Sequence, residues 1–301
     1  MQADPLIHWP EPILEFAGFL GLFLSAGAVG FRYSALRRGL GAGDRLAPTE
    51  RAAHEDAARR AALLGLLGSL IIAVLTAMSL PRQAARAHVG VLGLLTTNLV
   101  AGIQAGCLLL SLAGFALAAA RIRAGWVLAA VGVIVGTLRS AFTGQWARLV
   151  NPIHELAAAL WIGTLLVLVV AGISAVLRDE PARERRGAIV ADMVNGFSPL
   201  ALSMGAVVVT FGLTTAWRHL KSLPALWTTP YGWTLILKLC FVAMVFTLGA
   251  WNWRRQRPTL GTEDAAVAIR RSARAELIVA TIVLVITAVL VSLPVPKAPM
   301  P

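Results

Sequence analysis

Apolar residues along the chain gather into eight blocks of about 20 residues, separated by short polar or charged links. A stretch of that length crosses about 30 Å of hydrocarbon as a helix. No water satisfies backbone groups in hydrocarbon, so each block is predicted to be helical. The pattern therefore predicts an all-α, polytopic membrane bundle with eight transmembrane helices. The blocks cover residues 12–31, 61–80, 91–120, 125–141, 152–177, 199–217, 232–253 and 275–293.

The composition strengthens this assignment. Of the 301 residues, 57% are hydrophobic and only 14% are charged, whereas a soluble protein is about a quarter charged. The formal charge of +12 needs no nucleic acid to explain it, because Lys and Arg accumulate in the cytoplasmic loops of membrane proteins. The two cysteines, Cys107 and Cys240, both fall inside predicted helices, which argues against a disulfide framework.

The distribution of basic residues predicts the orientation. Of the 27 Lys and Arg residues, 19 lie in the links after the first, third, fifth and seventh blocks. The positive-inside rule places these links in the cytoplasm and both termini outside, in the periplasm of a Gram-negative source. His8, His88, His154 and His219 then fall on the outer side. His54 falls in a charged cytoplasmic link that is expected to be a solvated helix. The N-terminus lacks the basic region of a cleavable signal peptide.

A weak internal repeat suggests two related halves. The first block begins PILEFA at Pro12, and the fifth begins PIHELA at Pro152. Four helices per unit is an even number, so the two units would share one orientation and be related by an axis along the membrane normal. We therefore predict an N-terminal four-helix half, residues 1–150, and a second four-helix half, residues 151–301.

The start of the fifth block carries the strongest functional signal. Ionisable residues are costly at a membrane helix, so their presence points to function by default. Glu155 also has a structural explanation, since a carboxylate complements the positive end of the helix dipole. His154 has less of one, and imidazole is the commonest metal-binding side chain. Trp161 lies on the same helical face as His154, where it either floors a cleft or anchors the helix at the interface.

Further metal ligands are sought among the outer histidines and the soft side chains. His88 and His8 are candidates to join His154 and Glu155, although a single outer histidine is usually only solvated. Met78 is a candidate soft ligand, and packing is the alternative role for a methionine in a bundle. The strong zinc and copper signatures, closely spaced cysteines or histidines, are absent from the sequence.

A polar route through the helices is predicted around Lys238. A charge two turns into a membrane helix must snorkel or pair, and Glu15 and Glu155 are the candidate partners. Asn98 and Thr215 would line the same seam, or act as ordinary interhelical glue. No histidine lies at mid-membrane, so a transmembrane pair of haems is not expected, and one haem on the outer side stays open. No catalytic motif is found, and we predict that the protein is not an enzyme.

Residues 151–293 resemble the copper resistance protein D (CopD) family. The resemblance rests on HELAAALWIGTLLVL, FSPLALSMGAVVVTFGLTTAW, YGWTLILKLCFVAMVFTLGAWNWRRQRP and RRSARAELIVATIVLVITAVLVSLPVP, in that order. The positions that match the family pattern are His154, Trp161, Gly163, Lys238, Asn252 and Glu276. The chain departs at Gly163-Thr164, where the family often has Gly-Gly.

The resemblance implies transport of copper, of unknown oxidation state, across the bacterial inner membrane. It also implies a periplasmic copper-binding partner of the CopC type. The 301 residues contain no such domain, so the partner is expected to be a separate chain. Two alternatives stay open: a membrane factor that delivers copper without moving it through the bilayer, and a haem or quinone redox protein acting on the outer side.

Overall fold

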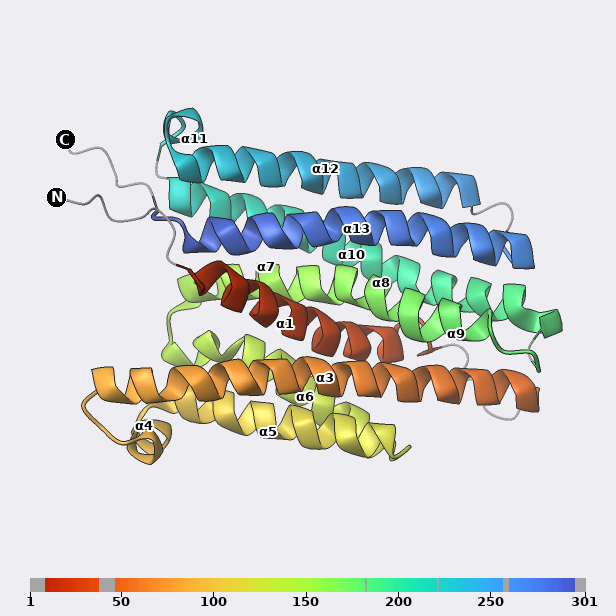
Figure 1. Cartoon of the computed structure of the whole chain (residues 1–301), viewed down its shortest axis with the longest axis horizontal. Coiled ribbons are helices and arrows are strands. Elements are labelled where there is room, and N and C mark those ends of the chain that lie inside the picture. The colour runs from red at the N-terminus through yellow and green to blue at the C-terminus, as the bar shows by residue number, and fades with distance from the viewer. Residues whose placement is uncertain (1–8, 38–46, 182, 221, 257–259, 296–301) are drawn as a thin grey trace.

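The computed structural model of the chain describes residues 9–37, 47–181, 183–220, 222–256 and 260–295, which contain helices and no strand (Figure 1). The long helices are α1 (Glu11–Tyr33), α3 (Pro48–Arg86), α5 (Leu99–Ala119), α10 (Arg186–Leu220), α12 (Pro230–Gln256) and α13 (Glu263–Ser292). The shorter ones are α4 (Val91–Thr97), α6 (Ala124–Thr137), η2 (Arg139–Thr143), η3 (Trp146–Leu149), α7 (Val150–Ala158), η4 (Ala159–Gly163), α8 (Thr164–Val167), η5 (Leu168–Ile173), α9 (Ser174–Val176), η6 (Arg183–Arg185) and α11 (Ala225–Thr228).

The predicted class, a polytopic helical membrane bundle, is confirmed. Within the described residues, seven helical segments are long and apolar enough to span a membrane, and α6 is a shorter apolar helix. α1 begins and α13 ends at the same end of the bundle, as an even number of crossings requires (Figure 1). We call this the outer end, after the orientation that the basic residues predict.

Two predicted helices differ from their observed forms. The third block was expected to be one helix, but it breaks at Asn98, whose backbone is extended between α4 and α5. The Asn98 side chain then caps α5 by accepting a hydrogen bond from the Ala101 amide at 3.1 Å. The fourth block was expected to reach residue 141, but α6 has 14 residues, which is about 21 Å of helix. The tight turns η2 and η3 lead from it to α7.

The fifth span is continuous over Trp146–Val176 but contains two π-helical turns, η4 and η5. Such turns are rare and often occur at functional sites. Here η4 also lies directly on α1, because a Cβ on Gly163 would be 2.1 Å from the Phe23 carbonyl oxygen. Glycine at this position is what lets the two helices approach closely.

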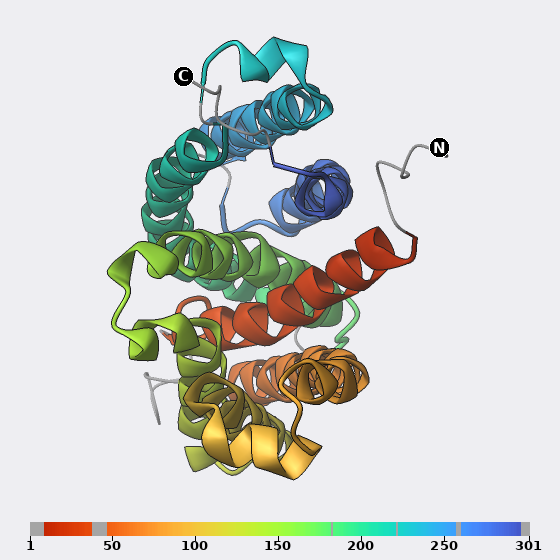
Figure 2. The ribbon, with the colours of Figure 1, turned by 90° about the vertical axis from the view of Figure 1, so that its left-hand side faces the viewer.

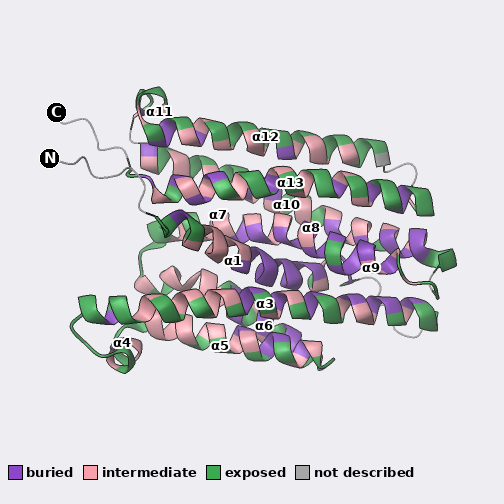
Figure 3. Cartoon of the chain, in the orientation of Figure 1, coloured by how far each residue is buried: buried purple, intermediate pink, exposed green. Residues whose placement is uncertain are grey.

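α1 is the central element of the bundle. It packs against α3 and α6 of the N-terminal half and against η4, α8 and α13 of the second half. In the end view it crosses obliquely between the two groups (Figure 2). One hydrophobic core includes residues of both halves, and buried residues gather on α1 and along α8 and α9, while α12 is largely exposed (Figure 3). The division at residue 150 and the internal repeat stay predictions.

The link that contains His54 is wrongly predicted to be solvated. α3 begins at Pro48 and continues for 39 residues, so its first turns pack onto the inner ends of α1 and α9. His54 is therefore only 2% exposed. Its Nδ1 donates to the Glu50 carbonyl oxygen at 2.7 Å, and its Nε2 is buried without a hydrogen-bond partner among the described residues.

Candidate functional site

His154 projects from α7 onto one face of α10. Its Nδ1 lies 3.0 Å from the Val208 carbonyl oxygen, and a carbonyl can only accept, so Nδ1 carries the hydrogen. In the neutral ring the lone pair is then on Nε2. Metal-binding histidines are commonly oriented in this way, by a carbonyl on the nitrogen that does not bind the metal.

Gly212 makes room for the imidazole. A Cβ at this position would lie 2.7 Å from Cε1 of His154, closer than side-chain atoms pack. Gly212 is one helical turn beyond Val208 on α10, so the two residues hold the ring from the same face. His154 is half-buried there. The sequence alone gave no indication that Gly212 belongs to this site.

Lys238 adds a charge to the surroundings of His154, and Thr215 lies two helical turns beyond Val208 on α10. Lys238 is half-buried on α12, and its charge acts on both His154 and Glu155. The Thr215 hydroxyl of α10 is buried and has no hydrogen-bond partner within the described part of the chain. The positive charge of an ammonium group repels an incoming metal cation. Coordination of that cation by the imidazole offsets the repulsion. This arrangement suits a site that a metal occupies transiently.

Trp161 holds the neighbouring turn in place. In η4 its ring lies against Phe246 of α12, with ring centroids 4.6 Å apart and an interplanar angle of 45°. Contacts of this geometry add about 0.5–1.5 kcal/mol beyond simple burial. Trp161 therefore fastens the π-helical turn below His154 to α12, and its predicted place in the transport seam stays a prediction.

Glu155, the next residue along α7, points to a different region. It lines a cleft of about 940 Å³ at the outer end, and Asn151 donates to its Oε1 at 2.5 Å. Residues of α1, α3, α5, α6 and α7 line the cleft. The ribbons of α1 and α3 diverge toward the outer end (Figure 1). Arg139, outside the spanning helices, lines it too. Burial lowers the pKa of the Arg139 guanidinium, and the charge of Glu155 opposes that shift.

Two other predicted residues, Glu15 and Met78, also line this cleft. Glu15 lies on α1 and interacts electrostatically with Glu155. Met78 lies on α3 and is 60% exposed. Deeper in the cleft, Ser69 of α3 is fully buried, and its hydroxyl has no hydrogen-bond partner in the described structure. The structure thus gathers Glu15, Glu155 and Met78 around one cleft, away from the α10 face that holds His154.

The remaining predicted residues lie elsewhere. His88 is exposed in the turn after α3, with a backbone φ of 54°. Asn98 is exposed and caps α5. His8 is outside the described residues. Among the residues that are described, no group of three or more His, Cys, Asp and Glu side chains forms a metal cluster, and both cysteines are free.

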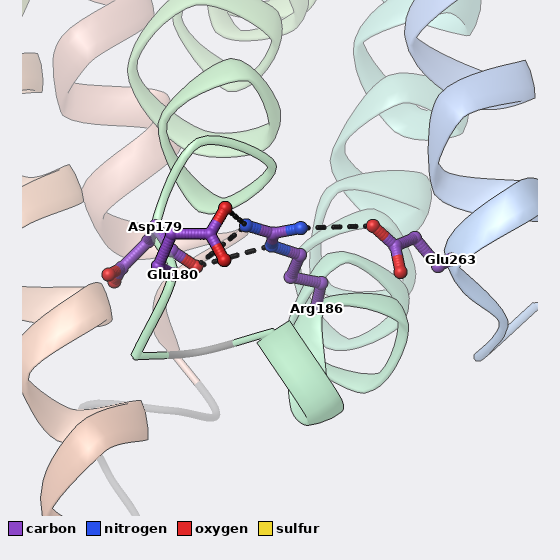
Figure 4. Close-up of polar contacts among 4 residues, drawn as sticks. All are labelled: Asp179, Glu180, Arg186 and Glu263. Atoms are coloured by element: carbon purple, nitrogen blue, oxygen red, sulfur yellow. Dashed lines mark hydrogen bonds and ion pairs between the residues drawn. The ribbon is translucent and has the colours of Figure 1, made fainter.

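The inner end carries a separate set of polar contacts. Arg186, only 7% exposed at its side chain, donates to Glu263 of α13 at 3.0 Å and to Glu180 at 3.1 Å. It also donates to the Asp179 carbonyl oxygen, so one guanidinium ties the start of α10 to α13 (Figure 4). These contacts connect the segment after α9, the start of α10 and the start of α13 at the inner end. Asn252 of α12 donates to the Glu276 carboxylate of α13, which pairs two positions of the sequence pattern.

Comparisons with known proteins find one family model and one relative that are similar to part of the chain. Residues 191–290 match the family model of copper resistance protein D. Copper transport protein CutJ of Bacillus subtilis (strain 168) is 30% identical over 175 residues, which cover 54% of this chain and 30% of the relative. The chain thus spans about 30% of that relative's length. No solved structure matches. Lys238, Asn252 and Glu276 lie inside the family match, and His154 lies before it.

Proposed function

Residues 191–290 of this chain belong to the copper resistance protein D family, and on that premise we propose that the protein carries copper across a bacterial inner membrane. The observation that carries the proposal is the state of His154. Its Nδ1 hydrogen is committed to the Val208 carbonyl, so Nε2 is the nitrogen that can bind a metal. The relative CutJ is a copper transport protein, which supports copper as the cargo.

We assign the other side chains according to their places. His154 is the principal copper ligand, reached from the outer side. Lys238 lies beside the path and weakens the hold on the cation, which favours release. Glu155, with Glu15 behind it, supplies negative charge that draws cations toward the outer end. The roles of His88 and His8 as additional ligands stay predictions, as do those of Asn98, Thr215 and Met78 in the seam.

The partner is proposed on the same basis. Copper reaches such a site from a carrier, so a separate periplasmic copper-binding protein of the CopC type would dock at the outer end. The lipid bilayer surrounds the helices. Arg148, Trp146 and Trp227 are exposed near the outer end and belong to the surface on which such a carrier would dock.

The decisive experiment compares the purified wild type with His154→Ala. In proteoliposomes the wild type is expected to accumulate copper, and the variant should lose on the order of a hundredfold in rate, because removing a ligand costs at least as much as removing its supporting hydrogen bond. Metal analysis of both proteins accompanies the flux. Equal copper content in the two proteins would rule out His154 as the site. If the wild type binds copper but shows no flux, the transport proposal fails, and the alternative of a membrane factor that delivers copper is supported.

A control separates the loss of the ligand from a change in the fold. Gln145→Ala alters an exposed outer residue just before the span and should leave flux and copper content unchanged. Its thermal unfolding, measured beside that of His154→Ala in the same detergent, establishes whether both variants keep the bundle intact.

A further inference from the structure

One face of α10 carries a series of residues that the proposed function does not fully use. Val208, Gly212, Thr215 and His219 are spaced by four, three and four residues, which places them in one row along the helix. All four are buried or half-buried, whereas neighbours such as Leu213 are exposed. The row therefore belongs to the less exposed face of α10.

His219, at the outer end of this row, is held in the same way as His154. Its Nδ1 donates to the Thr215 carbonyl oxygen at 2.8 Å, just as Nδ1 of His154 donates to that of Val208 at 3.0 Å. In both neutral rings the lone pair is thus on Nε2. Val208 and Thr215 are seven residues apart, so the two carbonyls are separated by about 10.5 Å along α10.

α12 provides a second row that runs alongside the first. The His219 ring is stacked on Tyr231, with ring centroids 6.5 Å apart and an interplanar angle of 20°. Tyr231 is buried near the start of α12, and Lys238 lies seven residues farther along. α10 and α12 run in opposite directions (Figure 1). Lys238 is about two helical turns beyond Tyr231 on α12, and its charge acts on His154.

The level between the two histidines contains an unsatisfied group. The Thr215 hydroxyl is buried and has no hydrogen-bond partner among the described residues. Leaving such a group unpaired is costly. A cation or its bound water passing between the histidines would satisfy that oxygen.

From this arrangement we propose that His219 is the outer copper ligand, from which the ion passes by the Thr215 hydroxyl to His154. The inference rests on the proposed transport function and defines its entry. It places the path between α7, α10 and α12, within the second half of the chain. Two nitrogens about two helical turns apart cannot share one ion, so they act as successive ligands.

Copper flux into proteoliposomes, measured over a range of copper concentrations, tests the proposal. His219→Ala should raise the half-saturating copper concentration on the order of tenfold, because an entry ligand is lost, while the maximal rate stays within about twofold, because His154 is intact. His219→Phe keeps a ring against Tyr231 but has no nitrogen, and it should behave like His219→Ala. Arg218→Ala removes the neighbouring cation of the same turn and should leave the half-saturating concentration unchanged.

The outcomes are distinct. If His219→Phe behaves like the wild type, the ring serves only to stack on Tyr231, and the proposal is overturned. If both His219 variants lower the maximal rate without moving the half-saturating concentration, the residue is structural and the proposal also fails. His154→Ala, included in the same series, tests the transport function itself. Copper flux that survives His154→Ala would contradict the proposed function. Flux that is lost in His154→Ala but unchanged in both His219 variants would contradict only the role of His219 as the entry ligand.

Discussion

His154 and Glu155 are adjacent in sequence, yet they belong to two different regions of the outer end. His154 lies against α10, where a carbonyl holds its ring and Gly212 leaves room for nothing larger than a hydrogen. Glu155 opens into a cleft of about 940 Å³ that serines, glutamates and arginines line. Successive helical residues point about 100° apart, so one turn of α7 serves both regions.

The difference between the two regions concerns how firmly a cation can be held. In the α10 region the nitrogen donor is fixed by one hydrogen bond and by close packing. In the cleft, Glu11, Glu15 and Glu155 are balanced by Arg82 and Arg139, and the space between them admits water. A preorganised donor gives specificity, whereas exposed charges in a wide space act mainly on the rate of approach. We therefore propose that His154 binds the copper ion and that Glu155 attracts cations toward the outer end.

Among changes that leave every proposed ligand in place, the largest effect is expected at Gly212, beside the His154 ring. In Gly212→Ala, the new Cβ would lie 2.7 Å from Cε1 of His154, so the ring must move away from Val208. Copper affinity should fall about tenfold, as when a supporting hydrogen bond is lost, and equilibrium copper binding to the purified protein measures this. Gly106→Ala is the matched control, because a Cβ there meets nothing within 4 Å. Unchanged affinity in Gly212→Ala would mean that the ring position does not matter.

A smaller effect is expected on the cleft side. Glu155→Gln keeps the size of the side chain and removes its charge. Copper flux should fall about threefold at low ionic strength, and the difference should disappear in about 1 M salt, because screening shortens the reach of charges to about 3 Å. Copper content should stay equal to that of the wild type. Loss of bound copper in Glu155→Gln would indicate that the copper ligand lies in the cleft, and it would contradict the assignment of copper binding to His154.

The smallest effect concerns the floor of the cleft. Ser69 is fully buried with an unpaired hydroxyl, whereas the hydroxyl of Ser111, which also lines the cleft, donates to the Cys107 carbonyl oxygen at 2.9 Å. Ser69→Ala should leave stability unchanged or raise it by about 1 kcal/mol, and Ser111→Ala should lower it by about 1 kcal/mol. Thermal unfolding in detergent measures both. A destabilised Ser69→Ala would show that water reaches this depth and bonds the hydroxyl.

Much of the fold could be predicted from the sequence, because the bilayer enforces simple rules. Long apolar stretches must become helices, and seven of the eight blocks are long spans in the structure. The exceptions have local causes. Asn98 competes for backbone hydrogen bonds and starts a new helix, which apolar content alone does not reveal. Burial of His54 required knowing that α3 continues inward and meets other helix ends.

The sequence alone shows which side chains are chemically costly: His154, Glu155 and Lys238 are polar groups in apolar helices. In the structure the charge of Lys238 acts on both His154 and Glu155. Their division between two regions depends on how the helices pack in three dimensions. This packing directed His154 toward Val208 and Glu155 toward Arg139, and it aligned His219 with His154 along α10. The free-energy cost of a polar side chain in a membrane helix depends on the residue type and on the apolar sequence around it, so it can be recognised from the sequence. Its partner depends on helix rotation and packing between segments distant in sequence.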